Sequence, residues 1–230
     1  MDSHGHRQTK DLDSLSGTRG ASAIFRSAPT SSSGVVVRPH GDVDRAEVRF
    51  FVYEDGLDEL TFAAEYREEL SLAILLGSFA IDQSGPYVEV SGFEEFLYVA
   101  DETNLYPKTK PTLERVNAHL HRGEGVPEHH IVGIFVSIPG CDAKLTAEVA
   151  RTHLSLFNIP FQMALAFDPT VRRLGAFVRP PRSRFENTPF WTVGAARSHA
   201  DPSDEESGTQ IEEPASSLAS EISDVVDESR

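Results

Sequence analysis

The sequence predicts a single mixed α/β domain over residues 45–195, in which helices cover a β-sheet. Three observations lead to this fold class. Segments with the two-residue apolar period of strands alternate with segments that have the apolar period of helices. Apolar residues make up 39% of the 230 residues, and 14 residues are Phe, which is enough for a substantial core. The run from Leu70 to Gly77 is almost continuously apolar, as expected of a central strand that is covered on both faces.

The first half of the domain has the order strand, helix, strand, strand. Residues 46–54 alternate their apolar side chains between two faces, which is typical of a strand. Residues 57–69 carry apolar side chains at helical spacing and are predicted to form an amphipathic helix. The apolar run 70–81 follows as the central strand, and residues 85–100 form the next strand after a Ser-Gly-Pro turn.

The second half continues with a helix, a strand, a helix and two further strands. Residues 110–125 are predicted to form a helix that is capped near Thr112. An apolar strand begins near His130, and a Pro-Gly turn and a threonine cap lead from it into a short amphipathic helix. Residues 161–178 are predicted to be a hairpin around an Asp-Pro turn, and residues 189–195 offer a last strand.

Both ends of the chain differ in composition from the domain. Residues 1–44 have almost no apolar periodicity, so we predict that they are disordered. One apolar island within them, residues 21–27 (ASAIFRS), is a candidate docking motif. Residues 196–230 are predicted to be a second disordered segment. From residue 201 onward this segment carries ten acidic residues against one base, Arg230, and it supplies much of the net charge of −15.

Composition restricts the classes of function. No large basic patch is evident in the sequence, which disfavours nucleic-acid binding through the phosphates. No apolar run reaches 18 residues, and the N-terminus lacks the layout of a signal peptide, so we expect a cytoplasmic protein that does not enter a membrane. The single cysteine, Cys141, cannot build an intrachain disulfide framework or a cysteine-rich zinc site. The motifs of nucleotide-binding loops, serine-hydrolase elbows and HExxH proteases are absent from the sequence.

The stretch GIFVSIPGCDAKLTAEVARTH, residues 133–153, has the pattern of an apolar strand, a Pro-Gly turn, a threonine cap and a helix. Within this stretch, Val136 and Ile138 are separated by one residue. Seven residues later comes a Thr-x-x-Val pattern, formed by Thr146 and Val149. This layout resembles the JAB/MPN metalloprotease family, which carries H-x-H, seven residues and S-x-x-D, with a glutamate upstream before a GLLLG-like strand.

Flanking residues extend this resemblance to roughly residues 46–180. The segment LSLAILLG matches the family's upstream strand and places Leu70 at the glutamate position. Ser137, Pro139 and Thr146 fit the family's pattern around the ligands. The downstream strand, Asp-Pro turn and Gly-Ala-Phe strand are also similar. The resemblance implies a JAB/MPN-like fold, which is also described as cytidine-deaminase-like.

In the JAB/MPN family, the two histidines and the aspartate bind zinc, and the glutamate activates the bound water. The side chains at these positions offer no lone pair to a metal: Leu70, Val136, Ile138 and Val149. Buried aliphatic carbon instead stabilises a core by about 1.5–3 kcal/mol per side chain. We therefore expect a dry, buried cluster, no metal or other cofactor, and no catalysis.

The resemblance also implies how a silent member of this family acts. Members that lack the metal motif typically pair with another MPN-type subunit or serve as assembly scaffolds. We therefore expect a scaffold or interaction subunit whose partners are proteins, either another MPN-type subunit or a second copy of itself. The alternative is a divergent metal-dependent isopeptidase or hydrolase with ligands relocated to His153 and Asp142. His153 follows Val149 by one helical turn, but we favour the interpretation that it is a hydrogen-bonded, half-buried histidine.

Two segments are candidates for partner binding. Near the end of the domain, Phe190 and Trp191 follow a segment rich in Pro and Arg, and such residue types are enriched at interfaces. The competing interpretation is that these aromatic side chains pack back onto the domain. The acidic tail places four aliphatic residues at helical spacing, as in helices that dock into grooves: Leu218, Ile222, Val225 and Val226. The competing interpretation of these residues is a solvated tail with scattered aliphatic side chains.

Overall fold

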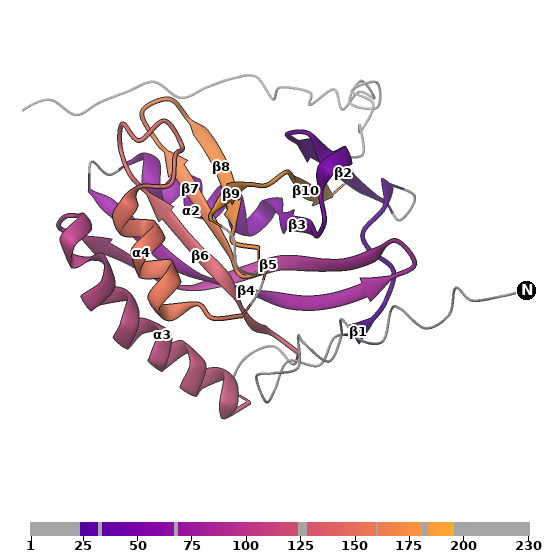
Figure 1. The fold of residues 1–230 in the computed structure, drawn as a ribbon, viewed down its shortest axis with the longest axis horizontal. Coiled ribbons are helices and arrows are strands. Elements are labelled where there is room, and N and C mark those ends of the chain that lie inside the picture. The colour runs from indigo at the N-terminus through magenta and orange to yellow at the C-terminus, as the bar shows by residue number, and fades with distance from the viewer. Residues whose placement is uncertain are drawn as a thin grey trace, which may run out of the picture. The chain divides into compact units, whose positions relative to one another are not determined.

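The computed structural model describes residues 24–31, 34–66, 69–123, 128–159, 161–180 and 184–195. Within these ranges, ten strands form one mixed sheet, and helices lie on both of its faces (Figure 1). The mixed α/β fold class predicted from the sequence is therefore confirmed. No helix among these residues is long and apolar enough to cross a lipid bilayer.

The strands of this sheet have the following bounds: β1 (Ile24–Phe25), β2 (Val35–His40), β3 (Arg49–Tyr53), β4 (Leu70–Asp82), β5 (Gly85–Val99), β6 (His130–Ser137), β7 (Met163–Asp168), β8 (Arg173–Val178), β9 (Glu186–Asn187) and β10 (Phe190–Ala195). They follow the order β2-β10-β3-β5-β4-β6-β7-β8-β9, and β1 pairs with β4. β4 is central because β5 and β6 both pair with it in antiparallel orientation. The pairs β6–β7 and β3–β10 are parallel.

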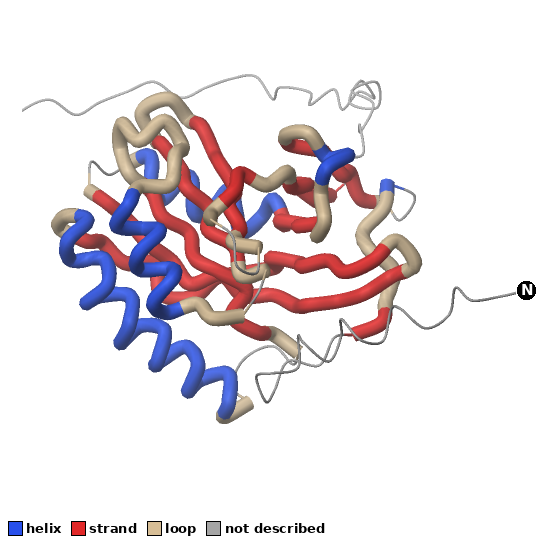
Figure 2. Tube along the Cα trace, viewed as in Figure 1, coloured by secondary structure: helices blue, strands red, loops and turns tan. Residues whose placement is uncertain are grey.

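Helices lie on both sides of this sheet. Among the described residues they are α2 (Glu54–Glu65), α3 (Leu105–His121) and α4 (Ala147–Leu156), with two 3-10 turns, η2 (Val43–Arg45) and η3 (Glu102–Asn104). α3 and α4 lie side by side over one face, whereas α2 lies on the other face (Figures 1 and 2). The buried residues accordingly form one apolar cluster that includes α2 and another that includes α3 and α4.

Alternation along the central strand supplies both cores. Leu72 and Ile74 of β4 belong to the cluster beneath α3 and α4. Ala73 and Leu75 belong to the cluster on the α2 side. The interpretation of the apolar run as a strand covered on both faces is therefore confirmed, although the strand continues to Asp82.

The prediction that residues 1–44 are disordered is wrong for the part that the structure describes, residues 24–31 and 34–44. There, β1 pairs in parallel with the end of β4, and β2 pairs in antiparallel orientation with β10. Short, partly polar segments order here because their backbone groups pair with an existing sheet, a non-local gain that local periodicity does not reveal. The island at 21–27 therefore includes a strand that docks on its own chain.

Helix α3 begins at Leu105, well before the predicted cap near Thr112. The carboxylate of Asp101 accepts hydrogen bonds from the backbone N–H groups of Thr103 and Asn104, and so caps the η3 turn that leads into the helix. Leu105 is fully buried, which holds the extra turns against the sheet. Thr112 is a buried residue inside the helix.

Candidate functional site

The four residues at which the resemblance would place zinc ligands and a general base lie together in one place. Leu70 begins β4, Val136 lies on β6, Ile138 follows β6, and Val149 lies on α4. β4 pairs with β6, and all four side chains belong to the apolar cluster beneath α3 and α4. They are 6%, 0%, 9% and 1% exposed, respectively. The expected burial of these four side chains is confirmed.

The residues that match the family's flanking pattern build the connection into α4. Thr146 is the N-cap of this helix, and its hydroxyl accepts a hydrogen bond from the backbone N–H of Val149 at 3.3 Å. Pro139 is half-buried in the turn, and Gly140 after it adopts a φ of +78°, which favours glycine. Ser137 is buried, and its hydroxyl has no hydrogen-bond partner. These residues therefore serve the local fold around the cluster.

Asp168 holds this turn to the sheet, a role that sequence reasoning missed. Its carboxylate accepts hydrogen bonds from the backbone N–H groups of Gly140 (3.0 Å), Asp142 (2.6 Å) and Thr170 (2.9 Å). Burial acts to raise the pKa of Asp168, but the hydrogen bonds from Thr170, Gly140 and Asp142 outweigh it and lower the pKa to about 2. The sequence does show Asp168 in an Asp-Pro turn, but only the fold shows that its carboxylate binds the backbone of Gly140 and Asp142.

The alternative ligands, Asp142 and His153, lie in very different surroundings. The carboxylate of Asp142 is partly exposed and pairs with Lys144 at 3.0 Å and with Arg173. A side-chain hydrogen bond from Lys144, with the charges of Arg173 and Lys144, lowers the pKa of Asp142. Within the described ranges, no group of three His, Cys, Asp or Glu side chains is placed to hold a metal ion.

His153 is a core residue of α4 rather than a half-buried one. It is 3% exposed, its ring stacks on Phe157 at 4.7 Å, and the edge of Phe185 approaches it at 5.1 Å. Its Nε2 atom is buried without a hydrogen-bond partner. Burial lowers the pKa of His153 to about 4, although backbone hydrogen bonds at Met163 and Gln162 oppose this shift. The ring is therefore neutral at physiological pH.

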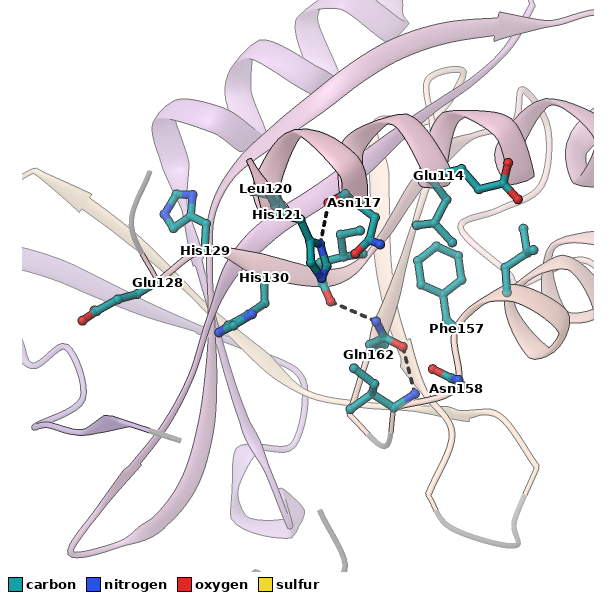
Figure 3. A pocket seen from close by; sticks show the side chains of 14 residues that line it. Glu114, Asn117, Leu120, His121, Glu128, His129, His130, Phe157, Asn158 and Gln162 are labelled. Carbon is teal, nitrogen blue, oxygen red and sulfur yellow. Dashed lines mark hydrogen bonds between the residues drawn. The ribbon is translucent and has the colours of Figure 1, made fainter. Parts of the chain in front are cut away.

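A cleft of about 560 Å³ lies between α3, the start of β6 and the connection from α4 to β7 (Figure 3). Its polar lining residues are Glu114, Asn117, His121, Glu128, His129, His130, Asn158 and Gln162, and its apolar ones are Leu113, Leu120, Ile131, Leu156, Phe157 and Ile159. Figure 3 shows that the Gln162 side chain connects two backbone segments beside the cleft. Its amide donates to the carbonyl of Ile131 at 2.9 Å and accepts from the N–H of Ile159 at 3.0 Å.

The histidines at this cleft are mostly engaged by the protein itself. His121 Nδ1 lies 2.7 Å from the carbonyl oxygen of Asn117, and His129 Nε2 lies 3.0 Å from the hydroxyl of Ser91. Burial lowers the pKa of both His129 and His130. None of the four degenerate positions lines the cleft. The cleft is therefore separate from the cluster of Leu70, Val136, Ile138 and Val149.

The predicted interaction residues Phe190 and Trp191 pack onto the domain. Phe190 is 4% exposed in the α2-side core and stacks on His40. Trp191 is half-buried and stacks on Phe51 at 5.4 Å. Strand β10 lies between β2 and β3, so its backbone is paired along both edges. The other four candidates lie outside the described residues: Leu218, Ile222, Val225 and Val226.

No family model and no curated protein matches this chain. Among solved structures, the chain is similar to the solution structure of protein DSY2949 from Desulfitobacterium hafniense. The two are 14% identical in sequence, with a TM-score of 0.40, and the match covers 65% of this chain and 97% of that one.

Proposed function

We propose that this chain is a non-catalytic JAB/MPN-like protein that acts by binding other proteins, as a scaffold or an interaction subunit. One observation carries the proposal. The positions that correspond to the family's zinc ligands and general base are all aliphatic and are buried in one cluster: Leu70, Val136, Ile138 and Val149. Such a cluster stabilises the fold through apolar burial and offers a substrate neither a nucleophile nor a proton acceptor.

The residues present do not fit the zinc ion that the family resemblance implies. A hydrolytic zinc site takes three protein ligands with nitrogen, oxygen or sulfur donors. The four positions provide only hydrocarbon, and the one unpartnered polar atom on β6 nearby is the hydroxyl of Ser137. We therefore derive no reaction through a metal at this position.

A role in binding is supported by surface features of the domain. The cleft of Figure 3 is lined by both apolar and polar side chains, a composition that suits ligand recognition. Phe62 of α2 and Tyr66, which follows this helix, form an edge-to-face pair at 4.8 Å, although they are 62% and 72% exposed. Exposed aromatic pairs are frequent at protein interfaces. A second MPN-type subunit or another copy of this chain is the proposed class of partner.

Metal analysis of the purified full-length protein tests the proposal against the alternative of a hydrolase with relocated ligands at His153 and Asp142. We expect far less than one zinc per chain by mass spectrometry. We also expect the same melting temperature with and without EDTA, because no bound ion stabilises the fold. Stoichiometric zinc together with a melting temperature that falls in EDTA would overturn the proposal and support the hydrolase.

The register of the resemblance can be tested by restoring the ligands. The triple variant Val136→His, Ile138→His and Val149→Asp places three donors in one buried cluster. We expect it to be less stable than the native chain without metal, since buried polar groups then lack partners, and to regain stability when zinc is added. The matched control keeps Val136 and carries only the other two substitutions, and zinc should stabilise it much less. If zinc has no effect on the triple variant, the register is wrong.

A further inference from the structure

A second groove runs between α4 and β8, and we call it the α4–β8 groove. Its volume is about 560 Å³, and its wall on the helix side comes from Ala147, Ala150 and Leu154. These residues lie three and four positions apart on α4, away from the buried face that includes Val149 and His153. The opposite wall comes from Phe177 of β8 and from Arg179, Arg184 and Phe185.

The α4–β8 groove is cationic in a chain whose net charge is −15. Lys144, Arg179 and Arg184 line it, and no acidic side chain does. The sequence explains this concentration, because residues 171–184 contain five arginines and no acidic residue. Lys144 pairs with Asp142 at 3.0 Å, and Arg173 pairs with the same carboxylate, so these two cations and one acid keep a net positive charge at the edge of the groove. The amino end of α4 adds the positive end of a helix dipole at the same edge.

Apolar side chains also line this groove. Phe177 of β8 and Phe185 are half-buried, and Leu154 of α4 is 46% exposed. Phe185 is held in place by its edge contact with the buried ring of His153. Apolar side chains flanked by polar and charged ones are the usual composition of an interface, which has an apolar centre and a polar rim.

We propose that the α4–β8 groove binds an acidic segment of a partner protein in which carboxylates alternate with apolar side chains. The carboxylates would pair with Arg184 and with the cluster of Lys144 and Arg173, and the apolar side chains would cover Phe177 and Leu154. This inference rests on the proposed binding function and specifies the chemistry of one partner. The sequence analysis found no large basic patch, whereas the fold brings several basic side chains together in this groove.

A peptide fits these observations better than a nucleic acid. Phosphate-backbone binding depends on many cations that act against many phosphates. Here three cations line the groove, and the four acids of α2's first two turns, together with the rest of the chain's negative charge, would repel a polyanion. A short acidic segment with apolar side chains carries less charge and gains from burial against the apolar side chains of the groove.

Fluorescence anisotropy with defined probes tests the proposal on the full-length protein. The main probe is a labelled peptide, EDLEEFDEL, and the comparison probes are EDSEESDES, KRLKKFRKL and a ten-nucleotide oligothymidine. We expect the first peptide to bind more tightly than all the others, and its affinity to fall between about 50 and 300 mM NaCl, because salt screens exposed charges. Tighter binding of the basic peptide or of the oligonucleotide would overturn the proposal.

Matched variants assign the binding to this groove. The pair Lys144→Glu and Arg184→Glu should weaken binding of the first peptide by roughly tenfold or more, whereas Lys108→Glu and Lys110→Glu on exposed positions of α3 should leave it unchanged. Leu154→Ser should weaken it as well, whereas Val171→Ser, at another exposed aliphatic residue, should not.

Circular dichroism establishes that each variant folds. Equal affinity in the groove variants and the native chain would place the peptide elsewhere and overturn the proposal. If the native chain contains no zinc and also fails to bind the acidic peptide, the inference about the groove is overturned, but the proposed non-catalytic function is not. The zinc and chelator measurements separately test the proposed function.

Discussion

Arg26, near the start of the described chain, forms an ion pair with Glu89 on the central part of the sheet. Glu89 is 4% exposed, so its carboxylate depends on partners within the protein. The hydroxyl of Ser78 donates to it at 3.1 Å, and the hydroxyl of Tyr87 donates to the backbone carbonyl of Arg26 at 3.0 Å. The segment around β1 therefore supplies the counter-charge of a buried carboxylate on β5.

Removing Arg26 should destabilise the domain. We expect Arg26→Ala to lower the free energy of unfolding by about 2–3 kcal/mol, less than the roughly 3–5 kcal/mol of fully buried pairs, because the arginine side chain is 43% exposed. Adding Glu89→Gln should recover part of this loss, since the uncompensated charge is then gone. Urea denaturation of both single variants and the double variant measures this coupling. Simple additivity would show that the pair contributes nothing.

Gly133 should not tolerate a side chain. A Cβ atom there would lie 2.1 Å from the carbonyl oxygen of Met163 on β7, a backbone atom that cannot move aside without breaking the parallel pairing. We expect Gly133→Ala to cost about 3 kcal/mol or more, or to prevent folding. Gly92→Ala is the matched control, because nothing lies within 4 Å of a Cβ at that position in β5. It should change stability by less than about 1 kcal/mol.

His153 should make stability depend on pH. Its pKa falls from 6.5 in the unfolded chain to about 4 in the native protein, so the unfolded state binds more protons between these values. The stability linked to this ring is fully present above pH 6.5 and is lost as the pH falls toward 4. The expected loss between pH 7 and pH 4.5 is about 2–3 kcal/mol.

The contribution of His153 can be separated from that of the other histidines. His153→Phe keeps an aromatic ring between Phe157 and Phe185 but cannot be protonated. Unfolding free energies of both proteins at pH 7 and at pH 4.5 give the comparison. We expect the variant to lose less stability over this interval. An equal loss in the two proteins would show that His153 is protonated in the native state as easily as in the unfolded chain.

Asp168→Asn should loosen the turn that precedes α4. An amide offers one acceptor oxygen in place of two, so at least one of the backbone N–H groups of Gly140 and Asp142 loses its partner. We expect a loss of about 2–3 kcal/mol at pH 7. Because the pKa of Asp168 is lowered to about 2, this stabilisation is present above pH 3.8 and is lost as the pH falls through 2. Asp101→Asn, at an exposed cap, is the control and should cost less than about 1 kcal/mol.

Much of the fold was predictable because its signals are local. The alternation of Leu72 to Leu75 indicates a strand with two buried faces, and Thr146 before an amphipathic stretch indicates a capped helix. The burial of Val136 and Val149 also followed from residue type. Strands β1 and β2 were missed, since they are held by β4, β10 and the Arg26–Glu89 pair rather than by their own periodicity.

The sequence by itself determined the class of the fold, the order of the elements from β3 to β8 and the hydrocarbon character of the cluster around Val136, because each depends on residue type and short-range spacing. Tertiary structure decided which distant groups meet. It brought Asp168 to the turn at Gly140, buried His153 between two aromatic rings, and gathered Lys144 with Arg184 along one groove. Burial and charge proximity are properties of three-dimensional packing, so they set pKa values and binding surfaces that no local pattern specifies.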